Sequence, residues 1–177
     1  ADGHLFMTAV NMQNPVSDWP STIMMADAQG ELVFYMPITD LTEPPYTRTP
    51  AGNFQLHNNG LMSFTDGLFG IVPGNIYVMD STFQIIDTLN CTPQYALDGH
   101  DFVMTDDGHY HLLAMEERII DASSLVTEGG QIGDTACTII GHIIQEFDEN
   151  KNLINEWKSL DHFALDDIYW YYFTDPT

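Results

Sequence analysis

The sequence contains very few positively charged residues. Its 177 residues include only 4 Lys and Arg against 26 Asp and Glu, which gives a formal net charge of −22. Proteins that bind nucleic acid or an anionic membrane surface need clustered Lys and Arg, because these side chains neutralise phosphate. We therefore expect neither nucleic acid nor a membrane surface to be a partner.

Signals for metal binding and for membrane insertion are also scarce. The two cysteines, Cys91 and Cys137, lie far apart and lack the CxxC spacing of a zinc or redox site, so a disulfide and two thiols both remain open. No apolar run approaches the roughly 18 residues of a membrane-spanning helix. No long helical stripe of apolar residues is present either. We expect no membrane insertion.

What the sequence does contain is a pattern of short strands and turns. Apolar residues alternate in short runs separated by Asp, Asn or Gly, which is typical of β-hairpins. Two segments, 54–65 and 102–115, each contain an Asn-Gly or Asp-Gly step at Asn59-Gly60 and Asp107-Gly108. Such steps supply the positive φ angles of type I′ turns, so we predict antiparallel hairpins with that turn at both places.

A second hairpin pattern, in which Asp opens the turn, recurs three times, at 24–35, 77–87 and 144–157. Together the two patterns give units of four short antiparallel strands, which is how the blades of a β-propeller are built. The three units fall at about 1–40, 53–89 and 100–158. The first unit lacks its opening strand. Residues 166–177 are predicted to begin a further blade.

The predicted fold class is therefore all-β, with residues 1–177 forming the N-terminal part of one β-propeller domain of about three blades. A β-sandwich of 11 or 12 strands is the alternative, because it also has regular strands and turns. Propellers typically need four to eight blades. We expect the remainder of the propeller, or a partner chain, to complete the ring, and the chain to be one piece of a larger secreted protein.

Four segments carry a resemblance to a known family, namely Gly-His-Asp-Phe at 99–102 and the segments 107–113, 143–148 and 157–163. In order and spacing they resemble the arylsulfotransferase family of bacterial propellers, and the segment 5–35 is similar to that family's first blade. The resemblance implies a six-bladed propeller in the periplasm or outside the cell. It also implies transfer of a sulfuryl group from a phenolic sulfate ester to a phenol through a sulfated histidine, without a cofactor.

The chain ends at Thr177, before the position at which the resemblance places the family's His-x-Asn-Ser segment. The resemblance therefore assigns the activity to the parent protein, and this chain alone is expected to be inactive. The alternative is a non-catalytic secreted propeller that serves as a binding, assembly or surface structural module, because a fold does not by itself imply a function.

His100 is the main catalytic candidate in the sequence. It is expected to begin the innermost strand of the third unit, near the mouth of the central channel, where Asp101 can orient an imidazole or bind substrate. The alternative for this His-Asp pair is a structural hydrogen bond between blades. His162 is a second catalytic candidate, at the predicted crossing into the next blade.

The remaining candidates have simpler alternatives. Tyr169 and Tyr171 belong to an aromatic run that forms either an aryl-binding wall or packing between blades. His109 and His111 share one face of a strand, as a metal pair or as ordinary surface. The segment 148–152 begins like a calcium loop, but Leu153 stands where the loop needs glycine, so we predict a turn. We predict no metal site.

Overall fold

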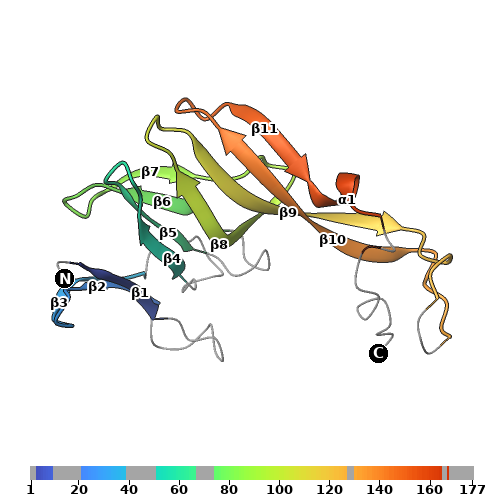
Figure 1. Cartoon of the computed structure of the whole chain (residues 1–177), viewed down its shortest axis with the longest axis horizontal. Helices are drawn as coiled ribbons and strands as arrows, with labels where there is room; N and C mark the ends of the chain where they lie inside the picture. Colours follow the sequence, from blue (N-terminus) through green and yellow to red (C-terminus); the bar gives the residue numbers. More distant parts are fainter. Residues whose placement is uncertain are drawn as a thin grey trace.

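The computed structural model of the chain describes residues 3–9, 21–38, 51–66, 74–126, 130–164 and 167. These residues form three antiparallel sheets (Figure 1). The first sheet contains β1 (Leu5–Ala9), β2 (Thr22–Ala26) and β3 (Leu32–Pro37). The second contains β4 (Ala51–Leu56), β5 (Met62–Asp66), β6 (Ile76–Met79) and β7 (Ile85–Leu89). The third contains β8 (Ala96–Met104), β9 (Tyr110–Ile120), β10 (Cys137–Phe147) and β11 (Leu153–Lys158), and the single-turn helix α1 (Ser159–His162) follows it.

Every strand in these sheets pairs with its neighbours in sequence, so each sheet is a meander of hairpins. The predicted all-β class is confirmed. The second sheet begins two residues before the predicted unit and ends with it at Leu89. The third sheet begins at Ala96 rather than at His100, which places His100 inside β8 instead of at its start.

One type of turn joins five hairpins of the described chain, at 27–31, 57–61, 80–84, 105–109 and 148–152. In each turn the first residue's N–H donates to the carbonyl four positions later, and its carbonyl accepts from the N–H three positions later. The fourth residue of each turn has a positive φ angle, and these residues are Gly30, Gly60, Phe83, Gly108 and Lys151. This is a type I turn that ends in a G1 bulge.

The predicted hairpins are therefore confirmed, but the predicted type I′ turn is wrong. A type I′ turn needs positive φ at two central residues, whereas Asn59 and Asp107 are not among the described residues with positive φ. Side chains stabilise the observed form. In the turn that Asp27 opens, its Oδ1 accepts the backbone N–H groups of Gln29 and Glu31, both at 2.9 Å. Asp148 makes the same pair of bonds in the predicted turn at 148–152.

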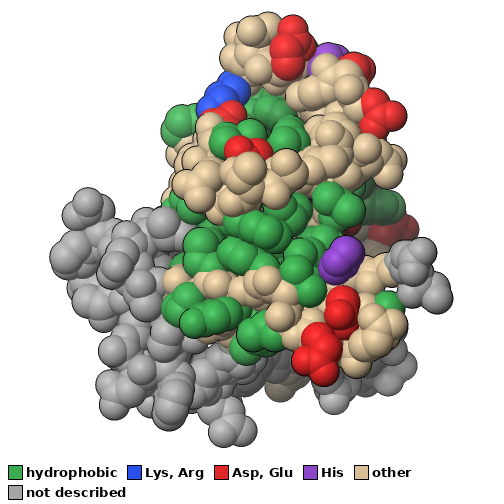
Figure 2. All heavy atoms as spheres, turned by 90° about the vertical axis from the view of Figure 1, so that its left-hand side faces the viewer, with side chains coloured by type: hydrophobic (Ala, Val, Ile, Leu, Met, Phe, Trp, Pro, Cys, Tyr) green, Lys and Arg blue, Asp and Glu red, His purple; other side chains and the backbone are tan. Residues whose placement is uncertain are grey.

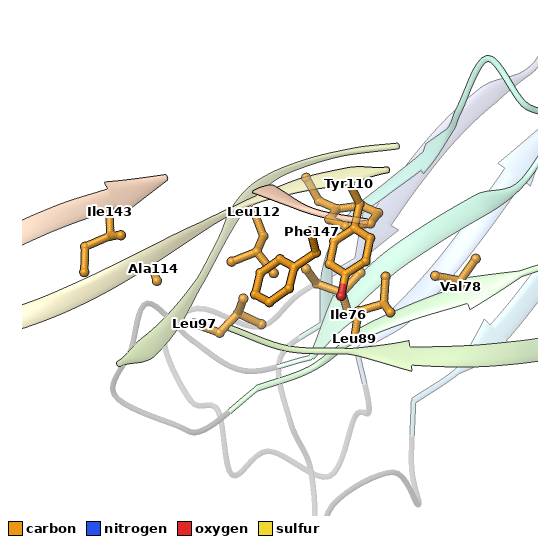
Figure 3. Packing of buried hydrophobic residues seen from close by; sticks show 10 residues of the cluster. Ile76, Val78, Leu89, Leu97, Tyr110, Leu112, Ala114, Ile143 and Phe147 are labelled. Carbon is orange, nitrogen blue, oxygen red and sulfur yellow. The ribbon is translucent and has the colours of Figure 1, made fainter. Parts of the chain in front are cut away.

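The two central strands of the second sheet, β5 and β6, are buried on both faces. Along β6, Tyr77 and Met79 pack toward the first sheet, while Ile76 and Val78 pack toward the third. The core between the first and second sheets consists of Ile23, Met25, Ile38, Phe54, Met62, Phe64, Tyr77 and Met79. The core between the second and third consists of Ile76, Val78, Leu89, Leu97, Phe102, Tyr110, Leu112, Ala114, Ile143 and Phe147 (Figure 3). Three stacked sheets exceed the two of a β-sandwich, which was the alternative considered.

Beyond the third sheet, β9 and β10 continue as a two-stranded arm that extends away from the stack (Figure 1). β8 pairs with β9 as far as Met115, and β11 pairs with β10 as far as Ile143, so the arm strands pair there with each other. The arm exposes Ile119 and Ile140. Its length was not predicted, because the sequence pattern indicated only short strands.

The two cysteines form no disulfide and are separate, half-buried thiols. Burial raises the pKa of the Cys91 thiol. Within the described part of the chain, no helix has both the length and the apolar character needed to cross a membrane.

Candidate functional site

A bulge in β8 positions the main candidate histidine. Asp98 pairs with Leu113 and Phe102 pairs with Leu112, so the three residues between Asp98 and Phe102 have no opposite partner on β9. Bulges of this kind are common beside active sites, where they redirect a side chain. Gly99 allows the bulge to approach the second sheet, because a Cβ at this position would lie 3.0 Å from Oγ1 of Thr65.

Asp98, rather than Asp101, holds the ring of His100. Nδ1 of His100 is hydrogen-bonded to Oδ1 of Asp98, and the same oxygen accepts the backbone N–H of His100 at 3.1 Å. The Asp98 side chain is only 4% exposed, while the His100 side chain is 58% exposed. A buried carboxylate thus fixes an accessible imidazole. With a carboxylate on Nδ1, the ring carries its proton there and its lone pair on Nε2.

A second imidazole contacts the same carboxylate. Nδ1 of His142 lies 3.8 Å from Oδ2 of Asp98, and its side chain is 63% exposed. His142 lies on β10, where its backbone N–H donates to Oγ of Ser159 at 2.9 Å. Sequence reasoning missed both Asp98 and His142. The strand period could have indicated Asp98 as the partner of His100, because residues two apart face the same side of a strand. No sequence pattern indicated His142, because only the pairing register of the strands brings β10 close to Asp98.

Asp101 acts on a different histidine. Its carboxylate accepts the N–H of Phe102 at 2.8 Å and raises the pKa of His57, although burial of His57 lowers that pKa more strongly. His57 is buried between the second and third sheets. Its Nδ1 accepts the N–H of Met104 at 3.3 Å, and its Nε2 lies 2.7 Å from Oγ of Ser63. The neutral ring with its proton on Nε2 satisfies both contacts.

This burial predicts that the fold loses stability in weak acid. Because burial holds the folded-state pKa of His57 below the ordinary histidine pKa of about 6.5, the unfolded chain binds the proton first. The His57 contribution is complete above pH 6.5 and falls as the pH drops through the folded-state pKa, with a slope of at most about 1.4 kcal/mol per pH unit. Urea unfolding between pH 8 and pH 5 measures it.

The matched control is His57→Gln, whose amide can accept from Met104 and donate to Ser63 without titrating. The wild-type chain should show a steeper loss of unfolding free energy between these pH values than the variant. Equal slopes for the two proteins would contradict a neutral, buried His57.

A second buried polar cluster lies at the end of β5. Asp66 accepts the N–H of Asn75 at 2.5 Å and the hydroxyl of Tyr77 at 3.0 Å. Burial raises the pKa of Asp66, and burial together with the Asp66 charge raises the pKa of Tyr77 to about 12. These groups satisfy one another inside the stack, which fits a structural role.

The other predicted site residues lie elsewhere. His162 is in α1, where its ring stacks on the indole of Trp157 with centroids 5.2 Å apart and planes 4° apart. Tyr169 and Tyr171 lie outside the described residues. The structure therefore brings His100 together with Asp98 and His142. The predicted pairing of His100 with Asp101 is not observed, because the ring of His100 is hydrogen-bonded to Asp98.

His109 and His111 both approach one carboxylate. Nδ1 of His109 lies 3.5 Å from Oε1 of Glu146, and Nε2 of His111 lies 3.8 Å from Oε2 of the same residue. Over the residues that the structure describes, no group of three or more His, Cys, Asp or Glu is arranged to hold a metal ion.

Every described Lys or Arg is paired with a carboxylate. Arg118 lies 2.8 Å from Glu116 and 2.7 Å from Asp161, which ties α1 to β9. The other two pairs are Lys151 with Asp87 and Lys158 with Glu156.

Figure 2 shows hydrophobic side chains gathered in the middle of one side of the molecule, with acidic side chains toward its upper and lower ends.

No model of a known protein family matches the chain, and no curated protein matches it. The resemblance to arylsulfotransferases therefore stays a prediction, and any functional argument depends on the site itself.

Proposed function

We propose that the three sheets are blades of a β-propeller whose complete ring transfers a sulfuryl group from a phenolic sulfate ester to a phenol. His100 is the nucleophile in this proposal. The observation that carries it is the hydrogen bond from Nδ1 of His100 to the buried carboxylate of Asp98. This bond orients the imidazole and places its proton on Nδ1, which leaves the lone pair that a histidine nucleophile requires on Nε2.

The proposed reaction has two displacements. Nε2 attacks the sulfur of the donor ester, an N–S bond forms, and the S–O bond to the donor breaks with its electron pair leaving as phenolate. The acceptor phenol then loses its proton to that phenolate and attacks the sulfur, and the N–S bond breaks with its electrons returning to Nε2. Two easier steps replace one difficult displacement.

The sulfate oxygens need hydrogen-bond donors or cations in both steps. The described Lys and Arg side chains are already paired with carboxylates. We therefore assign a donor role to the Nε2–H of His142, whose Nδ1 lies 3.8 Å from Asp98, too far for a hydrogen bond that would hold the proton on Nδ1. Further donors belong to the sheets that complete the ring, and an isolated chain is expected to be inactive. A ring in the periplasm or outside the cell is part of the same proposal.

The test is whether the complete ring transfers a sulfuryl group from 4-nitrophenyl sulfate to phenol. The reaction is measured by the absorbance of the 4-nitrophenolate that it releases. His100→Ala should abolish transfer. His109→Ala is the matched control, because His109 lies in the β8–β9 turn beside Glu146, and it should retain activity. Transfer that persists in His100→Ala would remove His100 from the mechanism.

A non-catalytic assembly module is the second candidate function. It is favoured by the outward face of the first sheet, where Leu5, Val33 and Tyr35 are exposed. Large exposed apolar faces usually mark interaction surfaces. Absence of transfer, together with association through this face, would favour assembly over catalysis.

A further inference from the structure

We propose that Gln55 and Thr65 of the second sheet are positioning residues for His100, because their side chains hold the bulge of β8 at its two ends. The candidate site is then built across the junction of two sheets and not on the third sheet alone. The inference rests on the proposed function for its effect on catalysis, whereas the positioning itself can be measured without any activity.

The strand that carries the bulge needs partners on its outer side. β8 is the strand at one edge of the third sheet, so β9 pairs with it on one side only. Backbone groups of an edge strand that point away from the sheet need other hydrogen-bond partners. The bulge adds to this need, because the residues between Asp98 and Phe102 have no opposite partner on β9. Side chains of the second sheet supply such partners.

Gln55 holds the end of the bulge. It lies on β4, the edge strand of the second sheet, and its Nε2 donates to the carbonyl of Phe102 at 2.6 Å. The carboxylate of Asp101 accepts the N–H of Phe102 at 2.8 Å. Side chains therefore hold both backbone groups of Phe102, while its ring is buried in the core between the two sheets.

Thr65 holds the start of the bulge. Its Oγ1 donates to the carbonyl of Gly99 at 3.4 Å, and a Cβ at Gly99 would lie only 3.0 Å from that oxygen, so the side chain packs directly on the backbone. The N–H of the same peptide group belongs to His100 and donates to Asp98 at 3.1 Å. The peptide group that leads into His100 is therefore held from the second sheet on one side and by the buried carboxylate on the other.

A further bond beyond the bulge continues this contact. The N–H of Met104 donates to Nδ1 of His57, in the turn that follows β4, at 3.3 Å. The second sheet thus bonds to backbone groups of β8 at the start of the bulge, at its end and beyond it. Bonds at separate points fix the direction of a segment as well as its position, whereas a single bond leaves the segment free to pivot.

The path of the bulge determines how His100 meets Asp98. Asp98 comes directly before the bulge and His100 lies within it, so the distance between imidazole and carboxylate depends on the backbone between them. A catalytic group must be held within about 0.5 Å of its productive geometry. A displacement of about 1 Å can cost roughly 100-fold in rate. Loosening the second sheet from β8 should therefore act on the His100 ring.

The first measurement is the state of the His100 ring in the chain itself. Gln55→Met keeps the approximate size of the side chain and removes its donor. We expect ¹⁵N chemical shifts of the imidazole to show a smaller fraction protonated on Nδ1. The amide N–H of His100 should exchange with solvent about 5-fold faster or more, which is the factor for one typical hydrogen bond. Gln84→Met, at an exposed glutamine in the turn at 80–84, is the matched control and should change neither.

A pair of variants at Thr65 separates hydrogen bonding from packing. Thr65→Val keeps the shape of the side chain and removes its hydroxyl, whereas Thr65→Ser keeps the hydroxyl and removes a methyl group. We expect Thr65→Val to change the His100 ring and amide as Gln55→Met does, and Thr65→Ser to leave both as in the wild type. A residue that serves only packing would give the opposite order.

The effect on catalysis is measured in the complete ring, with rates taken per folded chain. Gln55→Met and Thr65→Val should lower kcat for transfer from 4-nitrophenyl sulfate about 10- to 100-fold and leave KM within about 2-fold. Thr65→Ser and Gln84→Met should retain kcat. This division between kcat and KM is expected because neither Gln55 nor Thr65 is placed in contact with substrate.

Two results would overturn the positioning role. One is an unchanged His100 tautomer and amide exchange in both Gln55→Met and Thr65→Val, and the other is an equal effect of Thr65→Val and Thr65→Ser. Failure of the proposed activity is distinguishable from both. If the complete ring transfers no sulfuryl group but the His100 ring changes in the variants, only the activity is rejected. If transfer requires His100 but kcat is retained in both variants, only the positioning role is rejected.

Discussion

Replacing Asp98 with asparagine is expected to reduce His100-dependent sulfuryl transfer by roughly 10³- to 10⁴-fold in the complete ring. Loss of the carboxylate behind a catalytic histidine leaves the ring in place but allows the wrong tautomer, and comparable losses are known for such pairs. Asp98 is a positioning residue, because it acts through His100. The measurement is kcat for transfer from 4-nitrophenyl sulfate.

The matched control is Asp101→Asn. Asp101 is the acidic residue next to His100 in the sequence, and it was the predicted partner of the His100 ring. It should retain transfer within about 3-fold, because Asp101 bonds to the N–H of Phe102 and not to the ring of His100. A readout independent of activity is the ¹⁵N chemical shift of the His100 imidazole. Asp98→Asn should move the proton population from Nδ1 toward Nε2, and an unchanged tautomer would contradict the positioning role.

Truncating Phe102 to alanine is expected to destabilise the chain by about 3–5 kcal/mol. Phe102 is 1% exposed in the core between the second and third sheets. Its ring packs nearly perpendicular to the ring of His57, with centroids 5.3 Å apart, and its centroid lies 6.0 Å from that of Tyr110. Removing it leaves a cavity between the sheets that surrounding side chains only partly fill. Such a loss is a large part of a typical folding free energy of about 5–15 kcal/mol.

Urea unfolding measures this effect, with Val103→Ala as the control on the same strand. Val103 points to the other face of β8 and is 47% exposed, so its truncation should cost less than about 1 kcal/mol. Equal stabilities of the two variants would contradict the packing of the third sheet on the second.

Local features of the fold were predictable because local chemistry determines them. The steps at Asn59-Gly60 and Asp107-Gly108 identified two hairpins, since both type I′ turns and G1-bulge turns need a residue with positive φ, the conformation that glycine adopts most readily. That shared requirement is also why the turn type was wrong. Lys151 and Phe83 occupy the same positive-φ position without being glycine, which no propensity rule would favour.

The candidate site was only partly predictable because a bulge and a strand register determine it. His100 was identified from its motif, but Asp101 was chosen as its partner through adjacency in the sequence. Neighbouring residues in a strand point to opposite faces, whereas residues two apart share a face. By this period Asp98 was a better predicted partner for His100 than Asp101. His142 is 42 residues further along the chain, and it reaches Asp98 through pairing of β9 with both β8 and β10.

The meander order of the strands has a consequence for how the chain folds. Each strand pairs only with strands next to it in sequence, so no sheet requires a crossover to a distant strand. Chains rich in local contacts lose little entropy in closing loops and fold faster than sheets built from distant strands. Each sheet can form from its own hairpins, and stacking then couples nearest neighbours as in a repeat protein. The second sheet, which both neighbours stabilise, is expected to be the last to open.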